Sequence, residues 1–539
     1  MTKRKRKAQQ PQQQGPAPRR RAYEGALVSR LTAYWVTSST SADAEIDGSL
    51  VRLRNRSRQL VRDNGYAQQA LRCIVSNVIG TGVRMQAQVP MQRGGGRLDT
   101  AINDAIERRW ATWCHADTCH AAGQLSLQEI ARLAVRAMAE SGEVFVRLVP
   151  EAMGAGNVPL ALEILEADLC DEGKTSGPDA SGSEWRMGVR VNRWGRPLAY
   201  RFRTRHPGDV SGSVGYDAVD VPADQILHLR RIERPGQTRG VPWFAAAIKS
   251  LHHLSGYQEA EVVRARAASS LMGFITSPEG ELIGDDVYDD ERVSSFEPGV
   301  FKYLAPGESV SVPQLDAPDG QFEPFLRAML RGVAASTGCS FEQVSNDYSQ
   351  SNYSSNRMSR QDSIEMWKGE QQYAIEHFYR PIFARWMDAA VAVGDLQLPS
   401  YDTLRERYQA VRWYPRAWGF LDPKVEIGAY KDAVRCGFMT QAQVVAEQGG
   451  DLAELMRELA TEREMAQELG LTLDIDAGKV SGAGLTQARP PGSIIPQDPY
   501  AAEDTAAQAG EVKPEPPGDP DDPDDPDDPE DDDDQEDPA

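Results

Sequence analysis

SNDYSQSNYSSNRMSR, residues 345–360, is a polar segment inside the chain that contains no Gly, no Pro and almost no apolar side chain. It separates two stretches with helical periodicity and so fixes a helix–loop–helix arrangement. Its hydroxyl and amide groups can contact phosphate oxygens, and Arg357 and Arg360 supply positive charge, without demanding a particular base. We interpret the segment as displayed for contact with a repetitive polyanion; a mobile surface loop is the alternative.

The segments on either side of this loop predict amphipathic helices. The residues before it place apolar side chains at i, i+3, i+4, i+7, i+8 and i+11, which is one stripe of a helix, and Gly338 is well placed to end it. The residues after it continue an apolar face up to Pro381, which must kink or break the helix because proline lacks an amide proton. The stripes consist of Phe322, Phe325, Leu326, Met329, Leu330 and Val333 before the loop, and of Ile364, Trp367, Ile375, Phe378 and Tyr379 after it.

The net charge of −21 is concentrated at one end of the chain. Residues 501–539 hold eighteen Asp or Glu and one Lys, so the other 500 residues carry only −4. Residues 1–21 have the opposite character, with basic side chains and no acid. We expect both ends to be disordered, because neither can bury apolar surface. The residues of the basic arm are Lys3, Arg4, Lys5, Arg6, Lys7, Arg19, Arg20 and Arg21.

The length of 539 residues and the hydrophobic content of 40% predict two or three folded domains. No segment approaches the roughly 18 apolar residues of a membrane helix, and the basic N-terminus lacks the apolar core of a secretory signal. Six cysteines in a chain of this length do not make a disulfide framework. We therefore expect an intracellular, soluble protein with no membrane partner.

Signatures of catalysis and of cofactor binding are weak in this sequence. The cluster CHADTCH, residues 114–120, has C-x4-C-H spacing without a second pair, so a helix end is favoured over a metal site. The stretch Gly173, Lys174, Thr175 has Asp168 where a phosphate-binding loop needs its first glycine. We predict no enzyme, no cofactor and no metal.

Elsewhere the pattern predicts an α+β first half followed by mostly helical segments. Residues 23–83 are helical and rich in arginine; we interpret the arginines as solvated on a packed helix, which Gly80 and Gly82 should end. A long helix at 244–269 should turn Ile248, Leu251, Leu254 and Val262 inward. Further helices are expected at 102–113, 126–141 and 425–468, strands at 143–149, 161–165, 188–191, 199–203 and 225–229, and short strands with turns at 271–321.

Five segments taken together resemble the portal proteins of tailed phages, in the lambda-type family, over roughly residues 23–469. Each alone is a weak pattern, but they occur in the right order. The segments are RDNGYAQQALRCIVSNVIGTG (62–82), SGEVFVR (141–147), RPGQTRGVPWFAAAI (234–248), TGCSFEQVSNDYSQSNYSSNRMS (337–359) and WGFLDPKVEIGAYKDAVRCGFMTQAQVVAEQGGD (418–451).

The resemblance implies an α+β portal-type subunit with an α+β wing, a long helical stem, a small β-rich clip, a helical crown and disordered tails. It implies a tunnel loop that faces DNA, with Asn346, Ser351, Asn352, Tyr353, Arg357 and Arg360 as candidate channel residues. The expected parts are a basic arm at 1–22, the wing at 23–243, a stem helix at 244–270, the clip at 271–321, a second stem helix at 322–340, the tunnel loop at 341–360, the tunnel helix and wing return at 361–424, the crown at 425–472 and an acidic tail at 473–539.

The resemblance also implies the partners. Copies of the chain would form a homo-oligomeric ring of twelve at a capsid vertex of the virion, assembled in the host cytoplasm, as a conduit for non-specific double-stranded DNA. The ring would dock the terminase large subunit and later the head-completion or connector proteins, and would contact the major capsid or scaffold protein. Two alternatives stay open: a monomeric DNA-binding adaptor that uses the basic arm, and another packaging subunit such as a nuclease or ATPase.

Overall fold

A computed structural model describes residues 34–91, 97–209, 217–269, 274–276, 309–311, 322–420 and 422–471, and the isolated positions 26 and 30. The chain divides into two compact units, Met1–Met456 and Arg457–Ala539. The fold described below belongs to the first unit, apart from the part of the last helix that lies beyond Met456; of the second unit, the described residues are 457–471. None of the helices in the described part combines the length and the apolar content that crossing a bilayer requires.

The N-terminal region forms three helices instead of the continuous pattern that the sequence indicates. Asn64 has extended backbone, and its side-chain oxygen accepts the amide hydrogens of Tyr66 and Ala67, both at 3.0 Å. Such a cap satisfies the free amides at a helix start, so Asn64 ends one helix and begins the next. The third helix ends just before Gly80, whose φ of +58° suits glycine, as predicted. The helices are α1 (Ala42–Asp47), α2 (Leu50–Asp63) and α3 (Gly65–Val78).

The two helices predicted after this region are confirmed. The second begins with a capping box, in which Glu129 accepts the backbone amide of Ser126 at 2.9 Å. It ends at Gly142, whose φ is +94°. A short helix fills the interval between them. The bounds are α4 (Thr100–Trp113), α5 (Ala116–Cys119) and α6 (Leu127–Ser141).

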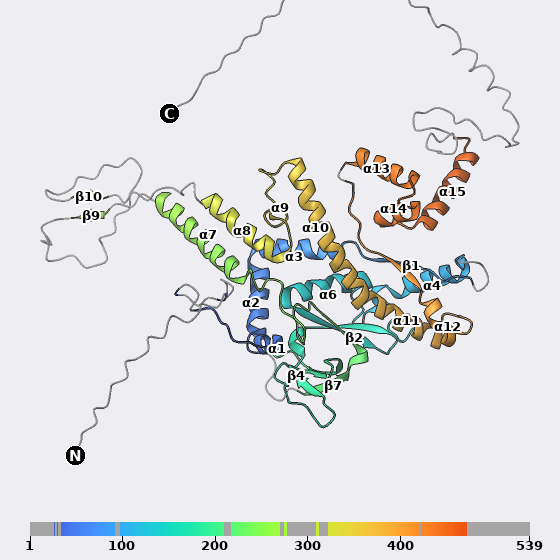
Figure 1. Cartoon of the computed structure of the whole chain (residues 1–539), viewed down its shortest axis with the longest axis horizontal. Coiled ribbons are helices and arrows are strands. Elements are labelled where there is room, and N and C mark those ends of the chain that lie inside the picture. The colour runs from blue at the N-terminus through green and yellow to red at the C-terminus, as the bar shows by residue number, and fades with distance from the viewer. Residues whose placement is uncertain are drawn as a thin grey trace, which may run out of the picture. The chain divides into compact units, whose positions relative to one another are not determined.

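Two antiparallel sheets complete the α+β part, shown in the lower half of Figure 1. The three-stranded sheet has the order β3-β2-β8, and α6 packs against β2 and β8; the four-stranded sheet has the order β4-β5-β6-β7. A separate two-stranded ribbon pairs β1 with β11, so it joins segments more than 300 residues apart. The strands are β1 (Arg84–Ala87), β2 (Glu143–Val149), β3 (Ala161–Leu165), β4 (Glu184–Arg186), β5 (Val189–Val191), β6 (Pro197–Arg203), β7 (Ala218–Pro222), β8 (Ile226–Arg230) and β11 (Val411–Tyr414), with 3-10 turns η2 (Ala167–Leu169) and η3 (Ala223–Gln225).

The five predicted strands of this region are confirmed, and four others were missed. Strands β1, β4, β7 and β11 have three to five residues and mix apolar with charged side chains, so alternation is hard to recognise in them. Their pairing depends on partners that lie elsewhere in the chain.

A buried charge cluster joins α2 to the sheets. Arg54, which was expected to be solvated, is completely buried and lies 3.0 Å from Asp168 and 3.4 Å from Glu143. Arg239 donates from Nε to both oxygens of Glu143, at 2.8 and 3.0 Å. The helical periodicity could not reveal this, because the acids that pair with Arg54 lie about a hundred residues away. Each buried charge of the cluster thus lies beside an opposite charge. Burying any of these charges without such a partner would be strongly unfavourable.

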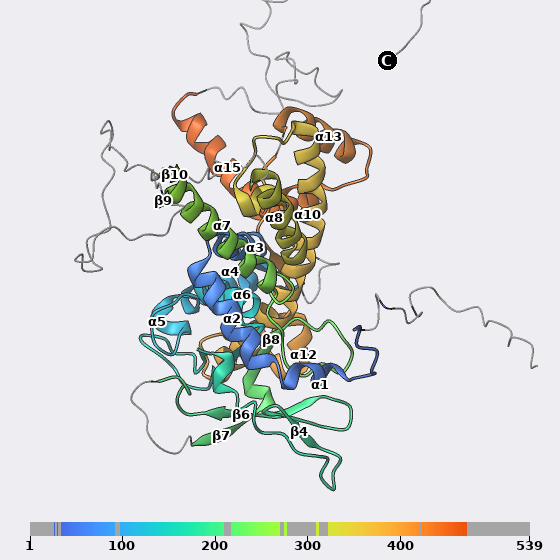
Figure 2. The ribbon, with the colours of Figure 1, turned by 90° about the vertical axis from the view of Figure 1, so that its left-hand side faces the viewer.

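Helices α7 (Ile248–Ser269) and α8 (Phe322–Thr337) lie side by side, as Figures 1 and 2 show. The ring of Tyr257 on α7 stacks on Phe322 at 5.8 Å and meets Phe325 edge-on at 4.7 Å. The long helix is confirmed, but the prediction for Val262 is wrong, because this side chain is 50% exposed. The predicted α8 stripe is confirmed at Leu330 and Val333, which are buried.

The predicted β-rich segment between these two helices is described only in part. Strands β9 (Phe274–Thr276) and β10 (Ser309–Ser311) pair antiparallel. The other residues of 271–321 lie outside the described residues.

The predicted break at Pro381 takes the form of a π-helical turn. The amide of Arg380 donates to the carbonyl of Ile375, five residues earlier, so the helix widens just before the proline and then continues. The helical path therefore continues through Pro381 instead of ending there. The elements are α9 (Phe341–Ser345), α10 (Tyr353–Ala374), the π-helix η4 (Ile375–Tyr379), α11 (Arg380–Ala392) and α12 (Tyr401–Tyr408).

Aromatic side chains from distant segments form the centre of the main core. Trp110 of α4 contacts Trp113, Phe383 and Trp386 at ring-centre distances of 5.1 to 5.2 Å, and Trp413 of β11 at 6.4 Å. These contacts hold α4, α11 and β11 together. Edge-on aromatic contacts of this kind add to the apolar area they bury.

The predicted helical segment near the C-terminus is confirmed, and glycines with positive φ interrupt it. Gly437 and Gly449 have φ values of +77° and +78°. The helices are α13 (Pro423–Arg435), α14 (Gln441–Glu447) and α15 (Leu452–Glu468).

Candidate nucleic-acid interface

The polar segment is divided between a short loop and a helix. Helix α9 ends at Asn346, whose φ of +55° is the left-handed conformation that Asn tolerates. Residues 346–352 are non-helical, and α10 begins at Tyr353. The expectation that all of 345–360 forms a loop is therefore wrong for its second half. The first turns of α10 bury no apolar stripe, so hydrophobic periodicity gave no helical signal there.

One ion pair anchors the loop to the preceding long helix. Arg327 of α8 contacts Asp347 at 3.0 Å and also Glu323, four residues before it, at 2.8 Å. The Ser349 hydroxyl and amide donate to the other Asp347 oxygen at 2.6 and 3.0 Å. The Ser349 hydroxyl first, and Arg327 after it, hold the pKa of Asp347 below its ordinary value. Asp347 thus remains charged and fixes the start of the loop.

The tip of the loop displays polar groups to solvent. Asn346 and Asn352 are exposed, and Tyr348 is 57% exposed. Ser351 is more enclosed, because its hydroxyl donates to the carbonyl of Tyr348 at 2.9 Å and accepts from Asn356 at 3.0 Å. The loop therefore has an ordered backbone and an exposed polar rim.

The two arginines of the segment lie one turn of α10 apart and at the edge of a groove. Arg360 donates to the carbonyl of Gly419 at 2.8 Å, which links α10 to the segment before α13. Arg357 is exposed. Both line a groove of about 750 Å³ between α10, residues 413–419 and the helices α13 and α14. Arg360 therefore has a structural contact in addition to its charge.

The structure brings the described candidate residues into one short region. Asn346, Ser351 and Asn352 lie in the loop, Arg357 and Arg360 follow on α10, and Tyr353 is the first residue of that helix. The basic-arm residues, 3–7 and 19–21, lie outside the described residues. The ion pair between Arg327 and Asp347 was not predicted from the sequence. The only related signal was the i, i+4 spacing of Glu323 and Arg327, which indicates paired charges on α8.

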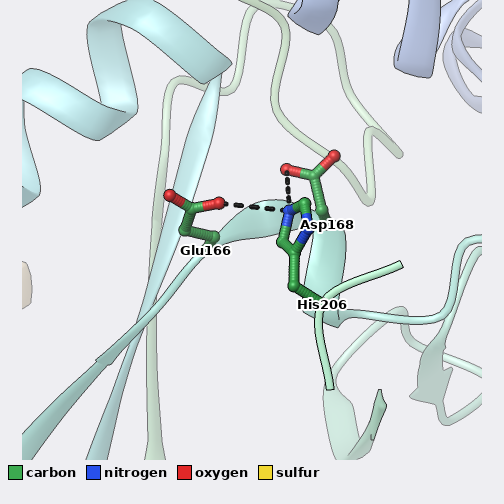
Figure 3. A group of neighbouring side chains, drawn as sticks. All are labelled: Glu166, Asp168 and His206. Atoms are coloured by element: carbon green, nitrogen blue, oxygen red, sulfur yellow. Dashed lines mark ion pairs between the residues drawn. The ribbon is translucent and has the colours of Figure 1, made fainter. Parts of the chain in front are cut away.

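One group of side chains has the composition of a metal site. His206 Nε2 lies 3.3 Å from Glu166 and 3.9 Å from Asp168, as Figure 3 shows. Asp168, however, already pairs with Arg54 at 3.0 Å and Arg58 at 2.7 Å. Burial alone would raise the pKa of Asp168, but the two arginines outweigh it and lower the pKa. A cation here would meet the positive charge of Arg58, so we assign the group as an ion-pair cluster.

The segment 114–120 begins at the end of α4, as the favoured interpretation of its sequence expected, and also contains the short helix α5. His120 Nδ1 accepts the amide hydrogens of Gln124 and Leu125 at 3.1 and 3.3 Å, which holds the turn before α6. Cys119 is buried, and burial raises the pKa of its thiol to about 12. A neutral buried thiol and a turn-forming imidazole explain this motif without a metal.

Known proteins match most of the chain. The probable portal protein of Halomonas phage phiHAP-1 is 27% identical over 464 residues, which cover 84% of this chain and 88% of the relative. Portal protein B of Escherichia phage lambda is 23% identical over 496 residues, which cover 84% of this chain and 91% of the relative. The portal protein of Escherichia phage N15 is 22% identical over 491 residues, which cover 84% of this chain and 92% of the relative.

Solved structures of gene transfer agent (GTA) particles are also similar. A chain from the virion of the native particle and a chain from the neck of the native particle, computed with C12 symmetry, each match with a TM-score of 0.40 and 14% identity. Each match covers 75% of this chain and 93% of the other chain.

A family profile decides the assignment. The profile described as phage portal protein, lambda family, matches residues 28–371, which is more than half of the chain. Portal proteins are structural components of the phage virion and not enzymes. The chain therefore belongs to the lambda family of phage portal proteins.

Proposed function

We infer that copies of this chain assemble into a closed ring at one vertex of the capsid, and that double-stranded DNA is packaged and ejected through it. Membership of the lambda portal family is the observation that carries this proposal. A ring needs a head-to-tail contact whose rotation closes, because each copy must offer a different surface to each neighbour. The proposed number of twelve copies rests on the family resemblance.

The proposed parts of the subunit follow the order of the elements. The α+β region of 23–243 would be the wing, and α7 and α8 would be the stem helices at 244–270 and 322–340. The clip would be 271–321. The tunnel-loop region, 341–360, would consist of α9, the exposed loop at 346–352 and the first turns of α10. The tunnel helix and wing return would be 361–424, the crown 425–472, and the arms 1–22 and 473–539.

The loop suits a channel because its contacts would be numerous and individually weak. Its exposed groups are amides and hydroxyls, and the exposed Arg357 follows on α10; such groups bind phosphate oxygens without reading bases. Each copy would add the same small contribution around the channel. Stronger contacts would hold a moving duplex in place, since phosphate neutralisation by many cations gives tight binding.

The proposed partners follow from the same role. The clip would dock the terminase large subunit during packaging and the head-completion or connector proteins afterwards. The wing would contact the major capsid or scaffold protein. Co-purification of the chain with each partner, with and without residues 271–321, tests the clip assignment.

The mass and shape of the purified protein test the ring. Light scattering and negative-stain microscopy should show a closed ring of about a dozen copies with a central hole. A monomer that binds DNA through residues 1–22, and loses binding when they are deleted, would replace the ring with the adaptor function.

A triple substitution tests the loop. Replacing Asn352, Tyr353 and Arg357 with alanine should leave rings intact and reduce DNA packaging. The matched control replaces three exposed residues of α12, Asp402, Thr403 and Glu406, and should package normally. Normal packaging by the loop variant would remove these residues from the channel.

A further inference from the structure

Two buried cysteines lie against each other where α3 meets the joint between α8 and α9. Cys73 lies on α3, and Cys339 lies in the joint, residues 338–340. The Cys339 sulfur lies 3.8 Å from the carbonyl oxygen of Ala70, about one turn before Cys73. Its thiol also donates a hydrogen bond to the Cys73 sulfur. Cys73 and Cys339 are 9% and 7% exposed, so the core holds two thiols in contact that come from distant parts of the sequence.

The position of Cys339 is fixed by the residues on either side of it. Gly338 follows α8 with a φ of +75°, and a Cβ there would lie 2.6 Å from the sulfur of Met366. Ser340 caps α9, because its hydroxyl accepts the amide hydrogen of Gln343 at 3.2 Å and its own amide donates to the Gln343 side chain at 3.0 Å. The joint therefore has little freedom, and Cys339 is held against α3.

Polar groups around Cys73 favour the thiolate form of its side chain. Asn77 Nδ2 donates to the Cys73 sulfur at 3.2 Å. Arg416 and Trp418 donate to Asn77 Oδ1 at 2.7 and 3.2 Å, which orients the amide nitrogen of Asn77 toward the sulfur. The Cys339 thiol lowers the pKa of Cys73 most; burial opposes it, and Asn77 and the charge of Arg416 lower the pKa further.

Cys339 has the properties of the second, protonated thiol. Its hydrogen bond to Cys73 first, and burial after it, raise the pKa of Cys339. The two thiols thus differ in acidity, which is the arrangement of a reactive cysteine beside a resolving cysteine. Cys114 and Cys119 provide a contrast within the same chain, because burial raises the pKa of both of their thiols.

We propose that Cys73 and Cys339 are a redox pair that forms an intrachain disulfide when hydrogen peroxide oxidises the protein. The Cys73 thiolate attacks one oxygen of the peroxide, which breaks the O–O bond, gives a sulfenic acid at Cys73 and releases hydroxide. The Cys339 sulfur then attacks the sulfenic sulfur and forms the S–S bond. The sulfenic hydroxyl leaves with the proton of Cys339 as water. The two sulfurs together lose two electrons, and the peroxide gains them.

The disulfide would tie α3 to the start of α9, just before the polar loop at 346–352. In the reduced protein, Gln69 of α3 donates to the carbonyl of Gln343 on α9 at 3.2 Å. A hydrogen bond of this kind breaks whenever the segment opens locally, and a covalent bond would prevent that opening. The pair would stay reduced in a reducing compartment and close under oxidising conditions. This inference concerns the single chain and does not depend on the proposed ring.

Peptide mapping tests the bond. The full chain, with Cys436→Ser to remove the exposed thiol, is treated with hydrogen peroxide, unfolded, alkylated and cut with trypsin without reductant. Peptide 73–84 should be joined to peptide 332–357, and reductant should separate them. Cys114 and Cys119 are the internal control and should be alkylated at the same peroxide concentration. Alkylation of both Cys73 and Cys339, or equal oxidation of the control pair, would overturn the proposal.

Substitutions test which sulfur reacts first. Cys339→Ser should leave Cys73 as a sulfenic acid, which dimedone traps, whereas Cys73→Ser should leave Cys339 reduced. Arg416→Met should slow the oxidation of Cys73 at least several-fold, and Arg416→Lys should restore the rate because it keeps the positive charge. Circular dichroism checks that each variant folds, and the wild-type map decides the bond even where a variant does not. Dimedone on Cys339 instead of Cys73 would overturn the assigned roles.

Limited proteolysis tests the effect on the loop. Protease should cut within residues 346–352 at least several-fold more slowly after peroxide treatment of the wild-type chain. The Cys339→Ser variant, which cannot form the bond, should be cut at the same rate before and after treatment. Equal rates for the oxidised and the reduced wild-type chain would show that the disulfide does not fix the loop and would overturn that part of the proposal.

Discussion

The guanidinium group of Arg239 lies 2.6 Å from the carboxylate of Glu143, and both side chains are completely buried. Glu143 also accepts the amide of Gly240 at 2.9 Å and contacts His228 at 3.0 Å. Burial alone would raise the pKa of Glu143, but Arg239 and then His228 hold it well below its ordinary value. The pair ties the segment SGEVFVR to the segment RPGQTRGVPW, so two motifs that are separate in the sequence form one structural unit.

Removal of one member of this pair should strongly destabilise the protein. Arg239→Met leaves Glu143 charged and buried, and we expect a loss of about 3–5 kcal/mol in the free energy of unfolding. Denaturant unfolding followed by circular dichroism measures it. The double variant E143Q/R239M should lose less than the sum of the single variants, because neither charge is then left alone. Additive losses would show that the two residues act independently.

As the pH is lowered, the protein should lose stability at pH values above those at which ordinary carboxylates become protonated. Burial, and then the charge of Arg230, lower the pKa of His228 from 6.5 to about 3. The unfolded chain therefore binds a proton at this histidine below pH 6.5 while the folded chain does not. The contribution of the neutral His228 to the free energy of unfolding is complete above pH 6.5. It decreases between pH 6.5 and pH 3, by up to about 1.4 kcal/mol per pH unit for one proton.

The variant H228Q isolates this contribution. Its amide can still donate to Glu143, but it does not titrate. Melting temperatures measured from pH 7.5 to 5 should fall less steeply than those of the wild type. Parallel curves would show that His228 does not control the acid response. Glu143, whose folded pKa is also depressed, should add a loss of stability below about pH 4.5 in both proteins.

The backbone contact beside this pair should not tolerate a side chain. Gly142 has a φ of +94°, and a Cβ there would lie 2.6 Å from the backbone carbon of Val241. A Cβ on Gly240 would clash with the carbonyl of Gly142. We expect Gly240→Ala to destabilise the protein by at least 1 kcal/mol, through strain that its neighbours cannot relieve. Gly177→Ala is the control, since a Cβ there meets nothing within 4 Å; equal melting temperatures for both variants would contradict the close contact.

The Asp347 anchor should affect the loop and leave global stability unchanged. In Asp347→Asn the pair with Arg327 is lost, so residues 346–352 should become more susceptible to protease while the melting temperature stays the same. Limited proteolysis with mass spectrometry locates the cut. Glu365→Gln, which removes an exposed ion pair with Lys368 at 2.8 Å, should leave the cleavage pattern of the wild type. An unchanged pattern in both variants would show that Arg327 does not order the loop.

The elements with a strong local signal were predictable from the sequence. The apolar stripe of α8, the capping box of α6 and the glycine breaks near Gly437 and Gly449 depend on residues a few positions apart, and the structure agrees with each. The first turns of α10 were missed because an exposed polar helix has no periodic apolar face. Val262 was placed inward because it is apolar, although its exposure depends on which side of α7 meets α8.

The sequence by itself determined the family, the order of the main elements and the polar character of the loop, because these follow from local patterns and from ordered motifs. Only the tertiary structure decided that Arg54 is buried, that Arg239 meets Glu143, and that Arg327 holds Asp347. A charge on a helix is solvated by default, and it becomes a buried partner only when an opposite charge is brought to it from a distant segment. Because the paired residues are far apart in the sequence, no periodic pattern of residues indicates the pairing. These ion pairs therefore become visible only in the folded chain.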